Sequence, residues 1–303
     1  VARKAGSGAG SKSERGAADS TPRWSGPRAP AVDEEPAMTS QHVVGRFFDV
    51  QGGQVYAHVR EGDGPALIFL HYWGGSRRTW IPVLQRLDPG QGFVAYDQRG
   101  WGGSTSVPGP YDLEQLADDA QRVVDALGYS RYVLVGHSMG GKVAQILAAR
   151  KPAGLRGVVL VAPAPPAPIG VTEQVQETVS HAYDNEEAVL QSIDLMLTRG
   201  GLTPELRRQV VEDSLRGGDE ARLEWPRRGL VQDVSAGVSA IEVPVLVLAG
   251  SHDKVDPPTV LADHLLPLIP TATLTVLKDT GHLSPLEVPD QVAAHIGAFV
   301  AQL

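Results

Sequence analysis

The sequence predicts an α/β fold, with a mostly parallel sheet of eight strands and helices on both faces. Three observations lead to this prediction. Short apolar runs of strand length recur along the chain, helical stretches separate them, and a hairpin pattern precedes the first of them. Strands that alternate with helices form a parallel sheet covered on both faces, because each helix packs on the sheet as the chain crosses to the next strand.

The predicted hairpin consists of His42–Val50 and Gln54–Arg60, which are rich in Val, Phe and Tyr and flank a Gly-Gly pair. Ala66–His71 reads A-L-I-F-L-H, the continuous apolar run of a strand buried on both faces. Runs of the same type follow at Phe93–Tyr96, Tyr132–Val135, Gly157–Val161, Val245–Leu248 and Thr273–Leu277. Helices are predicted over Arg78–Leu87, Leu113–Leu127, Met139–Arg150, Thr259–Leu266 and Asp290–Leu303. Asp112 is the expected N-cap of the second helix, and Gly128 the expected stop after it.

The composition excludes several classes of protein. Hydrophobic residues make up 42% of the 303 residues and charged residues 20%, as in ordinary globular chains. The balance of 27 Lys and Arg against 35 Asp and Glu gives a net charge of −8. This argues against a nucleic-acid partner, because phosphate neutralisation needs clustered positive charge. The absence of cysteine excludes disulfide scaffolds, Cys-ligated metals and thiol catalysis.

The chain divides into regions of different character. Residues 1–40 are rich in Gly, Ala, Ser and Pro without periodicity, so we expect a disordered tail or an extension upstream of the folded domain, residues 41–303. Within that domain, the stretch 163–243 interrupts the strand–helix alternation and is expected to form a helical cap over one edge of the sheet. We expect a cytoplasmic protein without a membrane partner, since the sequence has neither a signal-peptide pattern nor an apolar run near the ~20 residues that span a bilayer.

The strongest chemical motif is G-H-S-M-G, which begins where the predicted strand Tyr132–Val135 ends and leads directly into a helix. A strand that turns sharply into a helix forces Ser138 into a strained backbone conformation and lifts its hydroxyl clear of the sheet. Gly136 and Gly140 stand where a Cβ would collide with neighbouring backbone. The N-terminus of the following helix favours negative charge that develops at the serine.

From His42 to Leu303 the chain resembles the α/β-hydrolase fold superfamily, in its serine esterase, lactonase and haloperoxidase-like branch. That family places an acid after a late strand and a histidine after the last strand, in the order Ser, acid, His. Asp253, in the pattern G-S-H-D, matches the acid, with Asp256 as the alternative, and His282, in T-G-H, matches the histidine. The resemblance therefore implies a catalytic triad of Ser138, His282 and Asp253.

The residue types of this triad suit nucleophilic catalysis. A serine hydroxyl attacks a carbonyl only when a base removes its proton, and the acid holds the histidine in the correct tautomer. The resemblance implies an oxyanion hole made by the N–H groups of Met139 and Trp73, although Tyr72 stands where relatives carry glycine. We expect this side chain to narrow the acyl pocket.

Substrate-binding candidates are the residues near these motifs: Tyr72, Trp73, Trp101 and His137. For both His71 and His137, the favoured interpretation is hydrogen bonding that supports the site. Asp97 and Arg99 are expected to brace a glycine-rich loop beside the site.

The predicted function is hydrolysis of a carboxylic ester or lactone, with a small molecule as the partner, through an acyl-enzyme on Ser138. No cofactor and no metal are expected, because the histidines lack the spacing of helical metal ligands. A serine at this position disfavours epoxide hydrolases and haloalkane dehalogenases, whose nucleophile is aspartate. Carbon–carbon hydrolysis, cofactor-free haloperoxidase or perhydrolase chemistry, and a ligand receptor that uses the same pocket remain as alternatives.

Overall fold

The computed structural model describes residues 43–303, and the predicted tail, residues 1–40, lies outside them. No helix of this described part is both long and apolar enough to cross a membrane. The predicted cytoplasmic location stays a prediction.

An eight-stranded sheet forms the centre of the described residues, and the predicted fold class is confirmed. Its order is β1-β2-β4-β3-β5-β6-β7-β8, with β2 antiparallel to both of its neighbours and every other pair parallel. The strands are β1 Val44–Val50, β2 Gly53–Arg60, β3 Asp63–Leu70, β4 Gln91–Tyr96, β5 Tyr132–His137, β6 Leu155–Val161, β7 Val245–Gly250 and β8 Ala272–Leu277. Because the parallel strands end at one edge, the loops that follow β3, β5, β7 and β8 can meet there.

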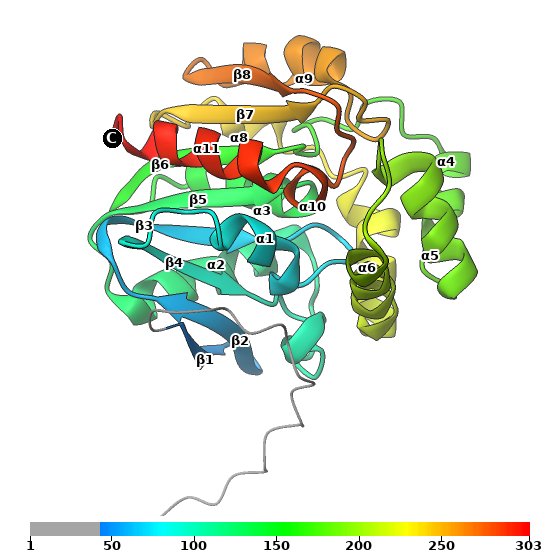
Figure 1. Cartoon of the computed structure of the whole chain (residues 1–303), viewed down its shortest axis with the longest axis horizontal. Helices are drawn as coiled ribbons and strands as arrows, with labels where there is room; N and C mark the ends of the chain where they lie inside the picture. The colour runs from blue at the N-terminus through cyan, green and yellow to red at the C-terminus, as the bar shows by residue number, and fades with distance from the viewer. Residues whose placement is uncertain (1–42) are drawn as a thin grey trace, which may run out of the picture. The chain divides into compact units, whose positions relative to one another are not determined.

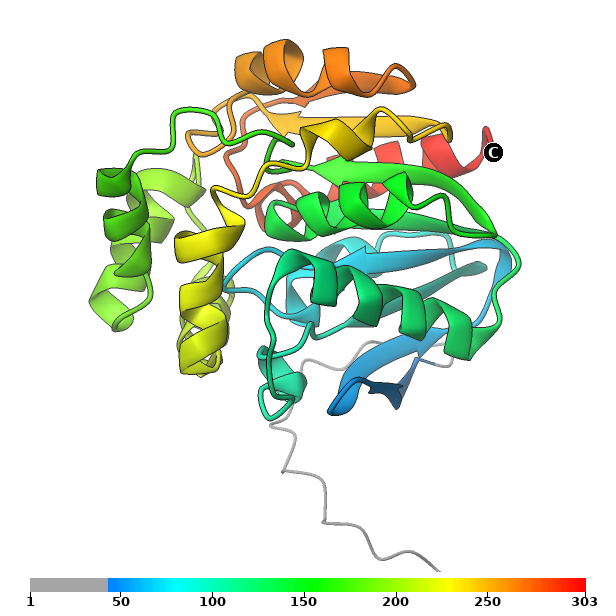
Figure 2. The same cartoon turned by 180° about the vertical axis from the view of Figure 1, so that it is seen from behind.

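Helices cover both faces of the sheet (Figure 1, Figure 2). One face carries α1 Ile81–Leu84, α10 Ser284–Glu287 and α11 Pro289–Val300, and the other carries α2 Leu113–Leu127, α3 Met139–Ala149 and α8 Ser235–Val238. Helix α9, Pro258–His264, lies beside β7 and β8 at one end of the strand order. Side chains of β5 alternate between the two cores: Tyr132 and Leu134 join one buried cluster, and Val133 and Val135 join the other.

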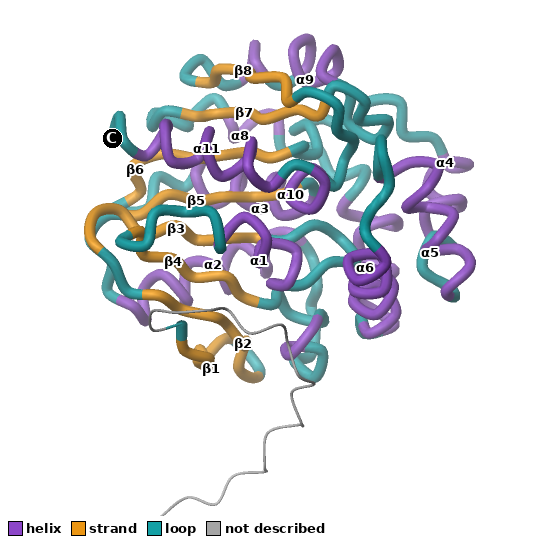
Figure 3. Tube along the Cα trace, in the orientation of Figure 1, coloured by secondary structure: helices purple, strands orange, loops and turns teal. Residues whose placement is uncertain are grey.

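The segment expected to form a cap lies between β6 and β7 and is helical (Figure 3). It contains α4 Glu173–Ser180, α5 Glu186–Ser192, α6 Pro204–Arg216 and α7 Asp219–Glu224, in addition to α8. Helices α5 and α7 continue into π-helical turns at Ile193–Leu197 and Trp225–Gly229. The helices α4 to α7 gather beyond the carboxyl ends of the central strands (Figure 1).

One buried carboxylate fastens this cap to the loop after β3. Asp213 of α6 accepts hydrogen bonds from the Ser76 hydroxyl at 2.9 Å and from Arg78 Nε at 3.0 Å. Burial outweighs the attraction of Arg78 and raises the pKa of Asp213 to about 6. The loop that precedes the first helix is thus tied to the cap as well as to the sheet.

The first helix is shorter than the predicted Arg78–Leu87. A 3-10 turn, Arg77–Trp80, precedes the single α-helical turn α1. Pro82 lies in the first turn of α1 and has no N–H to continue a helical ladder from the preceding residues, so the chain changes helix type there. The predicted bounds Arg78–Leu87 are therefore wrong, because the apolar pattern that predicts one helix is interrupted by a proline.

Helix α2 begins and ends as predicted. The Asp112 side chain accepts a hydrogen bond from the Gln115 N–H, and Gly128 ends the helix in the left-handed conformation with φ 64°. Gly297, in contrast, lies inside α11, where an added Cβ would meet nothing within 4 Å.

We predict opposite effects for the same substitution at these two glycines. Gly297→Ala should raise the free energy of unfolding by about 0.5–1 kcal/mol, because alanine loses less backbone entropy in a helix. Gly128→Ala should lower it by about 1 kcal/mol, because a Cβ is strained at this positive φ. Urea unfolding followed by circular dichroism measures both, and a change of the same sign in the two variants would contradict the assignment.

Candidate active site

Ser138 occupies the turn between β5 and α3. Its φ of 53° and ψ of −115° lie outside the ordinary regions for a residue with a side chain, and it is 7% exposed. A Cβ on Gly136 would stand 2.4 Å from the Gly140 carbonyl oxygen, and one on Gly140 would stand 2.5 Å from that of Leu70. The predicted steric role of the two glycines is therefore confirmed, and the turn depends on backbones that only glycine allows to approach so closely.

His282 and Asp253 are joined by a hydrogen bond at the same edge of the sheet. The Nδ1 atom of His282 lies 2.9 Å from Asp253 Oδ2, and both side chains are buried. The other carboxylate oxygen of Asp253 accepts from the N–H groups of Val255 and Asp256 at 2.8 and 3.0 Å. These bonds fix the carboxylate. With Nδ1 on the aspartate, Nε2 is the nitrogen that can face a hydroxyl.

The charges around His282 favour its protonated form. Burial opposes protonation, but attraction and hydrogen bonding to Asp253, together with attraction to Asp256, outweigh it and raise the pKa of His282. Asp256 itself makes no hydrogen bond to this ring among the described contacts, and burial raises its pKa to about 8. The recorded partner of the histidine is thus Asp253, whereas Asp256 acts on it through space.

His137 connects the serine turn to the histidine loop. It precedes Ser138, is fully buried, and its Nε2 lies 2.8 Å from the main-chain oxygen of His282. Because a carbonyl only accepts, Nε2 carries the proton. Burial and the neighbouring His282 lower the pKa of His137, so it stays neutral. These contacts place His282 beside the turn that carries Ser138.

The two expected oxyanion-hole donors lie in segments held in place by other contacts. Met139 is the first residue of α3, and Trp73 lies in the loop after β3. Neither backbone N–H donates to a protein atom among residues 43–303. Unpaired N–H groups of this kind are available to an anionic oxygen.

His71 fixes the conformation of the loop that carries Trp73. Its Nε2 accepts from the Gln98 N–H at 3.0 Å, so Nδ1 carries the proton and donates to the Tyr72 oxygen at 2.8 Å. Burial lowers the pKa of His71 to about 4, which keeps this tautomer neutral. The side chain of Gln98 also donates to the His71 oxygen at 2.8 Å. His71 therefore supports the loop by hydrogen bonding, in agreement with the interpretation favoured from the sequence.

The cap holds the same loop from above. The Trp73 indole stacks on Tyr183 with ring centroids 4.1 Å apart, and its Nε1 donates to the Arg222 oxygen at 2.9 Å. The Tyr183 hydroxyl donates to the Trp73 oxygen at 3.0 Å. Trp73 thus belongs to the interface of the sheet and the cap.

Tyr72 and Trp101 are both buried near the site. The Tyr72 ring lies 5.1 Å from that of His137, and its hydroxyl bonds to Ser214 of α6. Trp101 packs against the cap at Gly217, where an added Cβ would stand 2.4 Å from the indole. Tyr72 therefore lies between the site and the cap, and its substrate contact stays a prediction.

The glycine-rich loop beside the site is braced by ion pairs, in agreement with the interpretation of Asp97 and Arg99. Asp97 accepts from the Arg77 guanidinium at 2.5 Å and from the Gly103 N–H at 2.7 Å. Arg99 binds both carboxylate oxygens of Asp119 at 2.6 and 2.7 Å. Both pairs are buried, and they hold the loop that contains Trp101.

Lys142 is buried, which the sequence analysis does not predict. This residue lies one turn after Ser138 on α3, and its ammonium donates to the Gly229 oxygen at 3.3 Å and lies 5.9 Å from the Trp225 ring centre. Burial lowers its pKa to about 8, against the attraction of Asp256 and Asp233. A charge inside the otherwise apolar stretch M-G-G-K-V-A was the available signal. Lys142 ties the serine helix to the cap.

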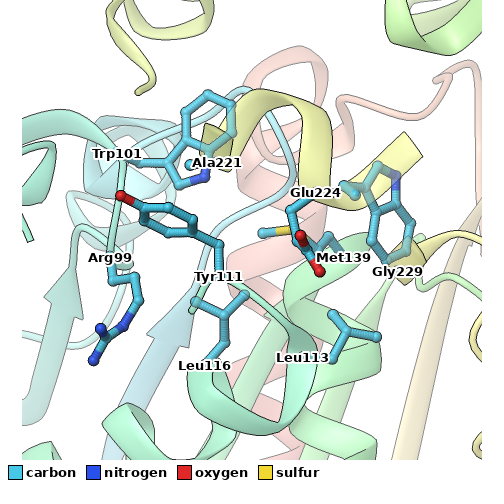
Figure 4. A pocket seen from close by; sticks show the side chains of 10 residues that line it. Arg99, Trp101, Tyr111, Leu113, Leu116, Met139, Ala221, Glu224 and Gly229 are labelled. Atoms are coloured by element: carbon cyan, nitrogen blue, oxygen red, sulfur yellow. The ribbon is translucent and has the colours of Figure 1, made fainter. Parts of the chain in front are cut away.

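A small cavity of about 10 Å³ lies beside Met139, between α3 and the cap (Figure 4). Trp101 and Met139 from the core meet Ala221, Glu224 and Trp225 of the cap around it. Two of the predicted site residues, Trp101 and Met139, thus share one cavity, whereas Tyr72, Trp73 and His137 are not among its walls.

Comparisons with known proteins agree with this architecture. The family model described as alpha/beta hydrolase fold matches residues 65–289. The chain is 30% identical over 242 residues to a 3-oxoadipate enol-lactonase of Acinetobacter baylyi, covering 77% of this chain and 88% of that one. It is 28% identical over 254 residues to a bifunctional esterase/perhydrolase of Acinetobacter calcoaceticus, covering 78% and 92%.

The fold is also similar to that of solved structures. An esterase from Exiguobacterium antarcticum superposes with a TM-score of 0.76 at 20% identity, covering 85% of this chain and 100% of that one. At this identity the likeness concerns the fold alone. The match of the family model and the identity to the enol-lactonase together show that the chain belongs to the α/β-hydrolase fold family.

Proposed function

We propose that the protein is a serine hydrolase that cleaves a carboxylic ester or lactone through an acyl-enzyme on Ser138. The observation that supports this most directly is the strained turn at Ser138 together with the His282–Asp253 hydrogen bond at the same edge of the sheet. A serine hydroxyl at the start of a helix, a buried histidine and a fixed carboxylate are the parts that nucleophilic acyl transfer requires.

In the proposed reaction, His282 Nε2 takes the proton of Ser138 as its oxygen attacks the substrate carbonyl. The negative oxygen of the tetrahedral intermediate accepts hydrogen bonds from the N–H groups of Met139 and Trp73. His282 then gives the proton to the leaving oxygen, and the ester bond breaks to leave the acyl group on Ser138. Water, activated by the same histidine, releases the acid and restores the serine. Asp253 keeps the ring oriented and stabilises its positive charge throughout.

Perhydrolase chemistry is a second candidate, since one relative is named a bifunctional esterase/perhydrolase and another a non-heme haloperoxidase. Both reactions would use the same acyl-enzyme, with hydrogen peroxide in place of water. Halogenation of a dye in the presence of acetate and peroxide, compared with turnover of p-nitrophenyl esters and lactones, distinguishes them. Carbon–carbon hydrolysis and a receptor role stay predictions without a supporting observation.

A fluorophosphonate probe should label Ser138, and Ser138→Ala should abolish labelling and lower kcat by about 10³–10⁶. The reason is that only this hydroxyl lies in the turn. Peptide mass mapping locates the label, and an ester assay measures kcat. Ser239→Ala, an exposed serine of the cap segment, is the control and should keep both. Labelling of another residue in folded protein would refute the nucleophile.

The pH dependence of kcat/KM should have an acid limb with its midpoint above pH 6.5. The proposed base works only when unprotonated, and its pKa is raised above that of an ordinary histidine, so activity should rise as the pH rises through this higher value. Initial rates between pH 5 and 9 with a neutral ester measure the profile, with circular dichroism to show that the fold persists. A midpoint at or below 6.5 would contradict the assigned environment of His282.

Asp253→Asn should lower kcat by about 10⁴, because the amide cannot hold the histidine in the required tautomer. Asp256→Asn should lower it by less than about tenfold, or 1.4 kcal/mol, since this carboxyl makes no bond to His282. Thermal unfolding of the two variants serves as the control for folding. If the larger loss followed the change at 256, the acid would be Asp256.

A further inference from the structure

The carboxylate of Glu287 bridges the cap and the loop that carries His282. Glu287 ends α10, the helical turn that follows this loop. Its Oε2 atom accepts hydrogen bonds from the Gly281 N–H at 2.7 Å and from the Thr280 hydroxyl at 3.1 Å. These two donors immediately precede His282 in the chain. This oxygen therefore holds the stretch of backbone from which the proposed base extends.

The other oxygen of Glu287 holds the cap. Its Oε1 atom accepts from the N–H groups of Arg199 and Gly200 at 2.8 and 3.0 Å. Both residues lie between the π-helical turn Ile193–Leu197 and α6. A carboxylate has about four acceptor positions on its two oxygens, so the four donors use all of them. Hydrogen bonds to a charged acceptor are also roughly twice as strong as those between neutral groups, so this bridge is a firm one.

The backbone of the histidine loop also touches the cap directly. The Leu283 N–H donates to the Leu197 oxygen at 2.9 Å. A Cβ on Gly281 would stand 2.9 Å from the carbonyl carbon of Thr198. Because these backbones lie so close together, a displacement of the cap at this point would be passed on to the loop of His282.

The opposite side of the loop rests on the serine turn and on the loop after β7. His137 Nε2 donates to the main-chain oxygen of His282 at 2.8 Å, and the His252 N–H donates to that of Thr280 at 2.9 Å. These contacts do not involve Glu287. Loss of its carboxylate should therefore displace the loop without unfolding it.

We propose that Glu287 is a positioning residue for the proposed base and that it couples the cap to His282. The inference rests on the proposed function, because it concerns the histidine of that reaction. On this side of the bridge its bonds go to Thr280 and Gly281, so Glu287 acts on the base through the chain and not on the substrate. Misplacement of a reacting group by about 1 Å can lower a rate about 10²-fold.

The test is Glu287→Gln, with Asp290→Asn as the matched control. Glutamine keeps the size of the side chain, but its NH2 group faces a backbone N–H in either orientation, so the bonds to one of the two segments are lost. Asp290 is a nearby carboxylate on α11 whose partner, Arg86, belongs to neither segment. We expect Glu287→Gln to lower kcat/KM for p-nitrophenyl acetate by about 10- to 10²-fold. Asp290→Asn should keep the wild-type value.

The pH profile distinguishes a positioning role of Glu287 from a purely structural one. Asp253, Asp256 and His137 are the titratable groups that act on His282, and the variants alter none of them. Burial lowers the pKa of His282, and the bond to Asp253 helps to raise it above the ordinary value. A ring displaced from Asp253 should have a lower pKa, so the acid limb of kcat/KM should move to lower pH in the glutamine variant. The control should keep the wild-type midpoint.

Thr280→Val is the second variant, in case the glutamine variant unfolds. It removes only the hydroxyl that donates to Glu287 and leaves the cap side of the bridge in place, so a smaller loss of rate and a smaller shift in the same direction are expected. Circular dichroism shows which variants fold. An unchanged kcat/KM in a folded variant would overturn the inference. A loss of rate with an unchanged midpoint, or an equal loss in Asp290→Asn, would overturn it as well.

The test separates failure of the inference from failure of the proposed function. If wild type hydrolyses no ester and Ser138 takes no fluorophosphonate label, the proposed function fails, and the inference falls with it. If Ser138 is labelled and wild type turns over the acetate ester while folded Glu287→Gln matches it at every pH, the acyl-enzyme stands and the role of Glu287 is refuted.

Discussion

The site depends on one constraint, the close approach of backbones around the turn at Ser138. The carbonyl oxygens of Leu70 and Gly140 lie where side chains on Gly140 and Gly136 would stand, so the loop after β3 and the end of β5 are pressed together beneath α3. Met139 follows Ser138 in this turn, and Trp73 belongs to the loop that begins after Leu70, so both proposed donors lie in the segments that meet here. The strain in the Ser138 backbone is held by the surrounding sheet, which is the condition under which such conformations persist.

The loop after β3, which carries the proposed donor Trp73, is supported from two sides by different kinds of contact. Beneath it, His71 is kept neutral by burial and makes directed hydrogen bonds with each ring nitrogen. Above it, the Trp73–Tyr183 stack and the hydrogen bonds of both side chains join the loop to the cap. A shift of the cap would therefore move a proposed donor as well as the pocket wall. If the proposed function holds, the cap and the proposed oxyanion-hole donor are therefore mechanically connected.

Local sequence patterns predict the fold, but they do not predict the contacts between distant residues that shape the pocket. Strand runs, the N-cap at Asp112 and the steric need for glycine beside Ser138 depend on residues close in sequence, where propensity and period act. The positions of Ser138, Asp253 and His282 also followed from motifs next to strands, although their catalytic roles stay predictions. The contact of Lys142 with Gly229 joins residues 87 apart in sequence, which periodicity cannot pair. A single lysine in an apolar helix indicates that Lys142 is buried, but the sequence does not show which residue it contacts.

For the same reason, the sequence does not predict the burial of Glu224. In α7 it is one of several charges in the stretch D-E-A-R-L-E, and Glu220 has the same local pattern. Only the packing of the cap separates them, since it buries Glu224 near Met139 and leaves Glu220 exposed. A carboxylate beside an apolar cavity is costly unless it is paired, and Arg228 supplies that pairing while its own side chain stays in water. An ion pair with one partner in water contributes little to the stability of the cap, because solvent screens the attraction.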